Sequence, residues 1–129
     1  SRAEMHHVVA LVENLPTFYK VRQMSVGSLK RFFRLVRLED HLELMRIHGA
    51  ASGGDLQDYS YASDRHREWN EADIAPRPLI TGQDLIALGF MPGPRFKEIL
   101  TRVEDEQLEG HVAGYSEAID FVMRHYGEA

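Results

Sequence analysis

The sequence predicts an all-α protein, a multi-helix bundle of about six to seven helices. Apolar residues recur with the spacing of a helix face along most of the 129 residues, and no stretch shows the strict alternation expected of a strand. Glycine or proline interrupts the periodic segments. With 43% hydrophobic and 27% charged residues, the chain has the composition of a globular protein that buries a core.

The first two helices are expected before residue 38. Residues 3–15 place apolar side chains at helical spacing, and Pro16 should end that helix because proline cannot donate the next backbone hydrogen bond. Ser25 or Ser28 can cap a second helix. Its apolar stripe consists of Leu29, Phe32, Phe33 and Val36. The second helix therefore has one face suited to the core, and its other face carries cations.

Two further helices are expected before the prolines. The third should run from about Leu38 to Ala51 and stop at the Ser-Gly-Gly of residues 52–54. Asp55 can cap a fourth, which carries apolar and aromatic side chains at helical spacing. These are Tyr59, Ala62, His66 and Trp69.

A change of composition at Ala75-Pro76-Arg77-Pro78 predicts a junction, because two prolines disfavour helix. The expected organisation is therefore a helical body over 1–74, a Pro-rich junction over 75–80 and a helical tail over 81–129. Thr81 with Asp84 should cap a two-turn helix that Gly89 ends.

The tail should begin with a pair of helices that resembles a helix-hairpin-helix. The turn Phe90-Met91-Pro92-Gly93-Pro94 should lead into a long amphipathic helix that reaches Gly110. A last helix should open at Ser116 and end before Gly127.

Charge is distributed very unevenly along the chain. The formal net charge is −5, which alone argues against a polyanion partner. Between Glu13 and Glu39, however, there are six cations and no acid. Four of the six, Lys30, Arg31, Arg34 and Arg37, follow a second face of the second helix. The net charge therefore averages a basic segment with acidic ones.

The basic face predicts contacts to phosphates. It spans about 10 Å, which suffices for two or three phosphates of a nucleic-acid backbone. Two alternatives remain: the face is simply solvated, or its cations pair with the acids of residues 55–73 across a helix interface. The absence of interleaved acids favours phosphate binding, because a solvated helix normally mixes both signs.

The turn at Gly93 is a second candidate for phosphate binding. It precedes a helix N-terminus, where backbone N–H groups lack partners, and Arg95 and Lys97 stand in the first turn, where the helix dipole favours acids. Cations in that place suggest an external anion. The alternative is that Gly89 ends one helix and the prolines stiffen a turn between packed helices.

Signals for catalysis, metal binding and membrane insertion are missing. The chain has no Cys, and its seven His show no metal-ligand spacing. No nucleotide-binding loop, nucleophile elbow or pair of Asp separated by one residue occurs. No apolar run approaches the ~20 residues that span a bilayer, and no signal peptide opens the chain. We therefore expect no catalytic residue, no metal and no membrane partner, and a cytoplasmic location.

Several long blocks of the sequence resemble a known family. These are Ser28-Leu-Lys-Arg-Phe-Phe-Arg34, Leu42 to Leu56, Arg77 to Leu100 and Glu106-Gln-Leu-Glu-Gly110. The order LITGQDLIALGFMPGPRFKEIL followed by QLEG is similar to the C-terminal half of bacterial CCA-adding tRNA nucleotidyltransferases and their poly(A) polymerase relatives. The resemblance covers roughly residues 26–122.

The resemblance implies an RNA-binding body and tail whose partners are tRNA or another structured RNA and the protein's own N-terminal head and neck. In that family the head adds nucleotides to the 3′ end with Mg²⁺ and CTP or ATP. The head and neck motifs are absent from this sequence, so no catalytic residue is carried over, although the parent protein should be a nucleotidyltransferase. Where many relatives have His-Arg-x-Asp, this chain has Met45-Arg-Ile-His48.

Two functions from different classes follow. The first is a tRNA-binding fragment that holds the RNA backbone through Lys30, Arg31, Arg34, Arg37, Gly93, Arg95 and Lys97 while an absent head extends the RNA. The alternative is a protein-interaction module that docks an acidic partner, or its own head, through the basic helix. A third possibility, a hydrolase using His and Asp, has the least support.

Overall fold

The computed structural model describes residues 1–53 and 55–127, and within them every regular element is helical. The all-α prediction is therefore confirmed. The helices are α1 (Arg2–Phe18), α2 (Val26–Phe32), α3 (Leu38–Ala51), α4 (Gln57–Glu68), α5 (Glu71–Ile74), α6 (Gly82–Ala87), α7 (Pro94–Leu108) and α8 (Tyr115–Tyr126), with a 3-10 turn, η1 (Val21–Gln23), after α1. The short α5 is the one described helix that the sequence did not lead us to expect.

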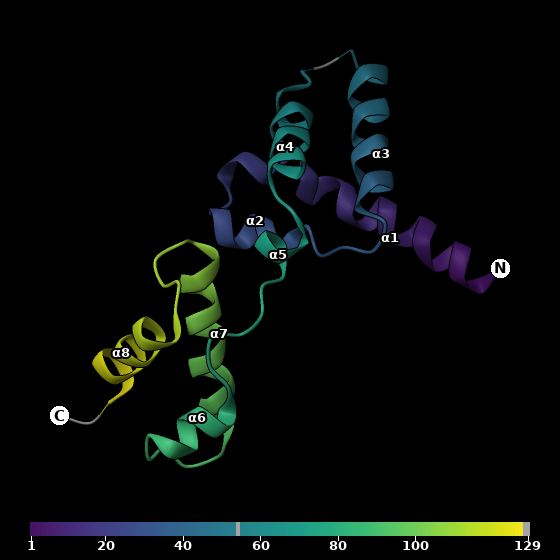
Figure 1. Cartoon of the computed structure of the whole chain (residues 1–129). Coiled ribbons are helices and arrows are strands. Elements are labelled where there is room, and N and C mark those ends of the chain that lie inside the picture. The colour runs from purple at the N-terminus through teal and green to yellow at the C-terminus, as the bar shows by residue number, and fades with distance from the viewer. Residues whose placement is uncertain (54, 128–129) are drawn as a thin grey trace.

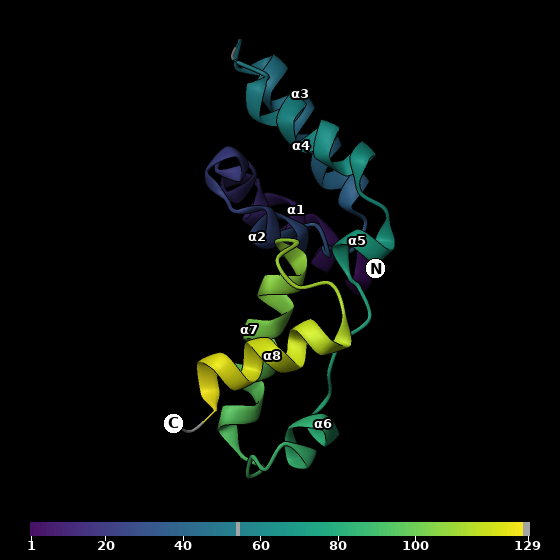
Figure 2. The same ribbon diagram turned by 60° about the vertical axis from the view of Figure 1, so that its left-hand side comes forward.

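The molecule is elongated, with α1–α5 at one end and α6–α8 at the other (Figures 1 and 2). An extended segment after α5 connects the two ends. Two separate hydrophobic clusters match this division. The first draws on side chains from Leu15 to Ile74 and includes the fully buried Phe18 and Leu29. The second draws on side chains from Leu79 to Tyr126.

Local signals account for the bounds of several helices. α3 covers the predicted residues 38–51, although Gly54 of the predicted break lies outside the described residues. Helix α6 begins with the predicted capping box, in which Thr81 and Asp84 satisfy each other's backbone N–H groups. Gly89 ends it with a φ of 97°, a conformation that glycine adopts without steric cost.

Helix α1 continues past the predicted stop. Pro16 lies inside the helix, which ends at Phe18. The buried Phe18, with 0% exposure, anchors this last turn in the first cluster. The opposite side of α1 leaves Met5, Val8, Val9 and Val12 exposed.

Helix α2 is shorter than predicted. It ends at Phe32, and residues 33–37 form a turn in which Arg34 and Leu35 donate to carbonyls only three residues back. The turn allows both Phe33 and Leu38 to enter the first cluster. Val36 is consequently 77% exposed, so its assignment to the apolar stripe was wrong.

No helix within residues 1–53 and 55–127 has the length and apolar character needed to cross a membrane.

Candidate nucleic-acid interface

The basic face of α2 packs against α7 of the tail. Nη2 of Arg31 lies 2.7 Å from a carboxylate oxygen of Glu104 and 2.9 Å from one of Asp105. The Lys30 ammonium donates a 2.9 Å hydrogen bond to the carbonyl of Leu108. The acids that pair with this face thus come from α7, beyond residues 55–73 where the sequence analysis placed possible partners.

The other two cations of this face differ in their surroundings, since Arg34 also contacts α7 and Arg37 lies toward solvent. Arg34 donates from Nε to the carbonyl of Ile74 at 2.9 Å and lies 3.3 Å from Glu104, and its side chain is 34% exposed. Arg37 follows the end of α2, pairs with Asp40 at 2.8 Å and is 61% exposed. The structure therefore divides the four predicted cations into three that contact α7 and one, Arg37, that faces outward.

The predicted hairpin residues also separate. Gly93 is the N-cap of α7 in an extended conformation, with φ 164°. The Arg95 guanidinium turns toward the end of α8, where it donates to the carbonyl of Tyr126 at 3.3 Å and lies near the rings of Phe90 and Tyr126. Lys97 is exposed. Arg95 and Lys97 therefore do not converge on one anion site.

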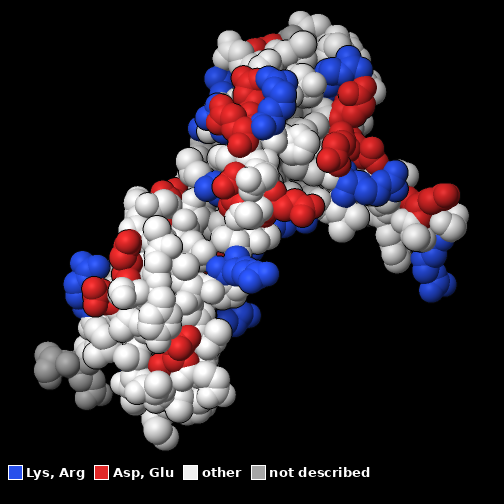
Figure 3. Space-filling view, viewed as in Figure 1, with Lys and Arg blue, Asp and Glu red and all other residues white. Residues whose placement is uncertain are grey.

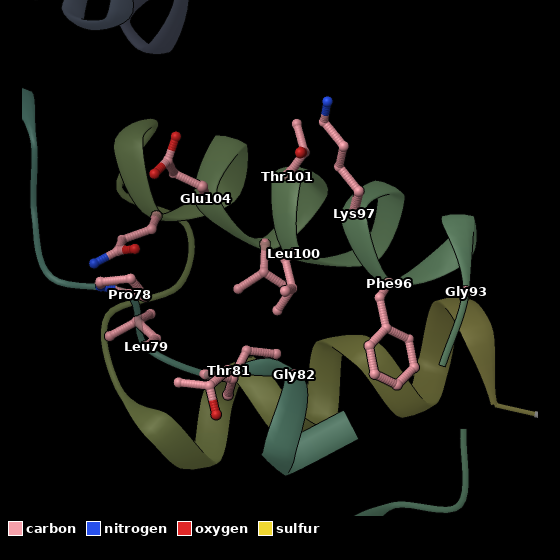
Figure 4. Close-up of a pocket in the computed structure, with 13 residues that line it drawn as sticks. Pro78, Leu79, Thr81, Gly82, Gly93, Phe96, Lys97, Leu100, Thr101 and Glu104 are labelled. Atoms are coloured by element: carbon pink, nitrogen blue, oxygen red, sulfur yellow. The ribbon is translucent and has the colours of Figure 1, made fainter. Parts of the chain in front are cut away.

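Lys97 instead shares a face of α7 with Glu104. Figure 4 shows Lys97, Thr101 and Glu104 on one side of the helix, while Phe96 and Leu100 point to the other side. Because Glu104 contacts Arg34, this face leads from the body to Lys97 along about two helical turns, or roughly 10 Å.

The side of α7 that carries Phe96 and Leu100 borders an apolar groove of about 660 Å³. Leu79, Thr81 and Gly82 form its opposite wall (Figure 4). The groove is lined mainly by hydrocarbon, with Lys97, Glu104 and Gln107 among the polar residues at its border.

A second cavity lies where the turn after α2 meets the end of α4, α5 and the junction. We call it the arginine pocket, because Arg34, Arg37 and Arg77 all line it. Its volume is about 680 Å³. The remaining lining residues are Phe33, Leu35, Leu38, Glu39, His66, Trp69, Asn70, Glu71, Ala72, Ile74 and Ala75.

Sequence reasoning did not assign a function to Arg77 or Trp69 at this site. Arg77 was considered only as part of the junction, and Trp69 as part of an apolar stripe. The available signals were an arginine between two prolines and the single tryptophan of the chain. Neither signal specifies a cavity, because the walls come from two segments, 33–39 and 66–77, that lie far apart along the chain.

Acids moderate the positive charge of the arginine pocket. Glu39 and Glu71 line it, and Asp40 pairs with Arg37. A hydrogen bond from His7, together with the charge of Arg37, holds the pKa of Asp40 below its usual range. On the face shown in Figure 3, positive and negative side chains are mixed over the body, and the tail carries fewer charges.

Histidines take part in polar and aromatic contacts within the body. His41, which is 2% exposed, stacks near Phe18, and His48 bonds to the hydroxyl of Tyr19 at 2.8 Å. Met45, at the position where the resemblance implies His, is 1% exposed and belongs to the first hydrophobic cluster. Among the described residues, no three His, Asp or Glu side chains are arranged to hold a metal ion.

Comparisons with known proteins assign the chain to a family. The profile of tRNA nucleotidyltransferase domain 2 matches residues 4–122, so the chain belongs to that family. The A-adding tRNA nucleotidyltransferase of Halalkalibacterium halodurans is 42% identical over 50 residues. These residues are 39% of this chain and 12% of that protein. No solved structure matches the chain significantly.

Proposed function

We propose that this chain is the RNA-binding body and tail of a tRNA nucleotidyltransferase, and that tRNA is its partner. The observation that carries the proposal is the family match over residues 4–122. The named activity of the bacterial relative points to the same class of RNA. Nucleotide addition, with Mg²⁺ and CTP or ATP, is assigned in this proposal to a head domain outside this sequence.

In this proposal the outward-facing cations contact the RNA backbone. Arg37, Arg77 and Lys97 are exposed, and among the described residues Arg77 and Lys97 have no ion-pair partner. Arginine and lysine neutralise phosphates and position an RNA without reading its sequence. Lys30 and Arg31 serve a different purpose here, since their charged ends hold α7 against α2.

The experiment is a measurement of tRNA affinity as a function of salt concentration. Each phosphate contact makes the slope of log K against log salt more negative by about 0.7 to 0.9, so three contacts predict a slope of roughly −2.5. Replacing Arg77 and Lys97 by Glu should weaken tRNA binding and make the slope less negative. Arg124→Glu on α8 is the charge-matched control, because Arg124 lines neither the arginine pocket nor the apolar groove.

Absence of tRNA binding at low salt, or binding that does not depend on salt, would contradict the proposal. Specific binding of an acidic protein without any affinity for RNA would favour the protein-interaction module instead.

A further inference from the structure

We propose that the arginine pocket holds one unpaired nucleotide of the bound RNA, with its base against Trp69 and its phosphate between Arg37 and Arg77. The inference rests on the RNA binding proposed above. It adds a defined subsite and a class of ligand, a single-stranded nucleotide rather than duplex backbone.

The shape and the walls of the pocket suit a nucleotide. A volume of about 680 Å³ lies within the range of small-ligand sites, which are mostly apolar cavities with a few polar groups. Trp69 and His66 supply aromatic surface, and Trp69 is held in place by an edge contact with Phe33 at 5.8 Å between ring centroids. The Lys30 ammonium lies 5.3 Å from the centre of the same ring. Stacking on such a ring is how proteins bind unpaired bases.

The cations are placed for a phosphate. Arg37 and Arg77 are exposed at the side chain and approach the pocket from segments 40 residues apart. Arg34 is less available, because it is tied to the Ile74 carbonyl and to Glu104. Glu39 and Glu71 in the same lining can accept hydrogen bonds from ribose hydroxyls or base amino groups.

The backbone of Arg37 supplies an independent indication. Its φ of 54° and ψ of 54° are left-handed, and among the described residues it is the one non-glycine residue with positive φ. Such a conformation costs of order 1 kcal/mol or more for an L side chain, and strained residues of this kind cluster at ligand sites. Glycine would adopt this conformation without strain. The presence of arginine therefore fits a role for its guanidinium in binding the phosphate.

Duplex RNA offers no unpaired base that could stack on Trp69 in this pocket. Its bases are paired and stacked, and proteins contact it mainly through phosphates and 2′-hydroxyls. A ligand that contacts the pocket only through a phosphate makes no use of the aromatic surface of Trp69 and His66. An unpaired nucleotide uses both the ring surface and the cations.

The single tryptophan makes the site directly observable, since all tryptophan fluorescence of this chain comes from Trp69. The probes are a single-stranded RNA tetranucleotide, a blunt RNA duplex of equal phosphate concentration, and whole tRNA. We expect saturable quenching by the tetranucleotide and by tRNA, and little change with the duplex. Equal quenching by duplex and single strand would overturn the proposal.

Two variants separate binding from folding. Arg77→Ala should weaken tetranucleotide binding by about tenfold, which corresponds to one charged phosphate contact. Arg37→Gly should weaken it similarly with little change in thermal stability, because relief of the left-handed strain offsets the loss of the exposed pair with Asp40. Arg124→Ala should leave the affinity unchanged.

The outcomes distinguish the proposed nucleotide pocket from the proposed binding of tRNA by the chain as a whole. Salt-dependent tRNA binding without any change in Trp69 fluorescence would overturn the nucleotide pocket and leave the proposed function standing. Loss of all RNA binding would overturn both. Unchanged affinity in Arg37→Gly and Arg77→Ala would also overturn the pocket, even if the wild-type fluorescence responds.

Discussion

The backbone N–H of Gly27 in α2 donates a 2.8 Å hydrogen bond to the carboxylate of Glu109, which lies 82 residues later at the end of α7. The approach is close, because a Cβ at Gly27 would lie only 2.6 Å from the Glu109 oxygen. The bond satisfies one of the backbone donors that a helix leaves unpaired in its first turn. Together with Arg31 and Lys30, it fixes the tail on the body.

Gly27→Ala should therefore destabilise the protein, although alanine favours helix. We expect a loss of about 0.5–1 kcal/mol in the free energy of unfolding, because the broken hydrogen bond outweighs the helix propensity gained. All three of the nearest atoms to the added Cβ belong to Glu109. In a Glu109→Ala background the same change should consequently become stabilising.

Chemical denaturation of the four proteins in this cycle gives the measurement. Gly82→Ala, where the nearest atoms are at an ordinary 3.6 Å, is the control and should not destabilise. Equal effects of Gly27→Ala in both backgrounds would show that the Glu109 contact contributes nothing.

The ion pair between Arg31 and Glu104 should show measurable coupling. A double-mutant cycle of Arg31→Ala and Glu104→Ala should give about 0.5–1 kcal/mol, since both side chains are about one-third exposed and Asp105 remains as a second partner. High salt should reduce the coupling. A matched cycle with Glu98→Ala on the same helix should give a value near zero, and similar values in both cycles would contradict a specific pair.

Asp84 should make stability depend on pH. Its carboxylate accepts hydrogen bonds from the Thr81 N–H, the Thr81 hydroxyl and the Tyr115 hydroxyl, and these hold the pKa of Asp84 below its usual range. A lowered folded-state pKa stabilises the protein above the unfolded value of about 3.9, and this contribution is lost as the pH falls through the folded value.

Asp84→Asn should accordingly destabilise at pH 7, and its difference from the wild type should shrink below about pH 4. Unfolding curves from pH 7 to pH 2 provide the test. Asp73 caps α5 in a similar box, so the effect of Asp73→Asn on the free energy of unfolding serves as a comparison for that of Asp84→Asn. A difference that stays constant over the whole range would mean that the charge of Asp84 is not involved.

The core of the tail depends on Leu85. This side chain has 0% exposure, so Leu85→Ala should cost about 2–5 kcal/mol through lost burial and the cavity left behind. The neighbouring Ile86 is 46% exposed, and Ile86→Ala should cost clearly less. Thermal unfolding of the two variants tests the assignment of the buried face, and equal losses would contradict it.

Much of the fold is encoded locally and could be predicted. The bounds of α3 and the capping box at Thr81 depend on residues within a turn or two of each helix end, so periodicity and cap residues reveal them. The end of α2 could not be predicted in this way. Residues 33–37 keep an apolar periodicity that fits a longer helix, and only the packing of Phe33 and Leu38 in one cluster requires a turn.

The residues of the candidate site were even harder to predict from the sequence than the end of α2. The sequence by itself determined that cations are concentrated between Lys20 and Arg37 and that a proline-bounded arginine follows in the junction. Only the tertiary structure decided which of these charges face solvent, because Glu104 and Leu108, the partners of Arg31 and Lys30, lie more than 70 residues away. It also brought Arg77 to the pocket beside Arg37. Ion pairing and cavity formation depend on distances in space, and the spacing of residues along a chain does not specify them.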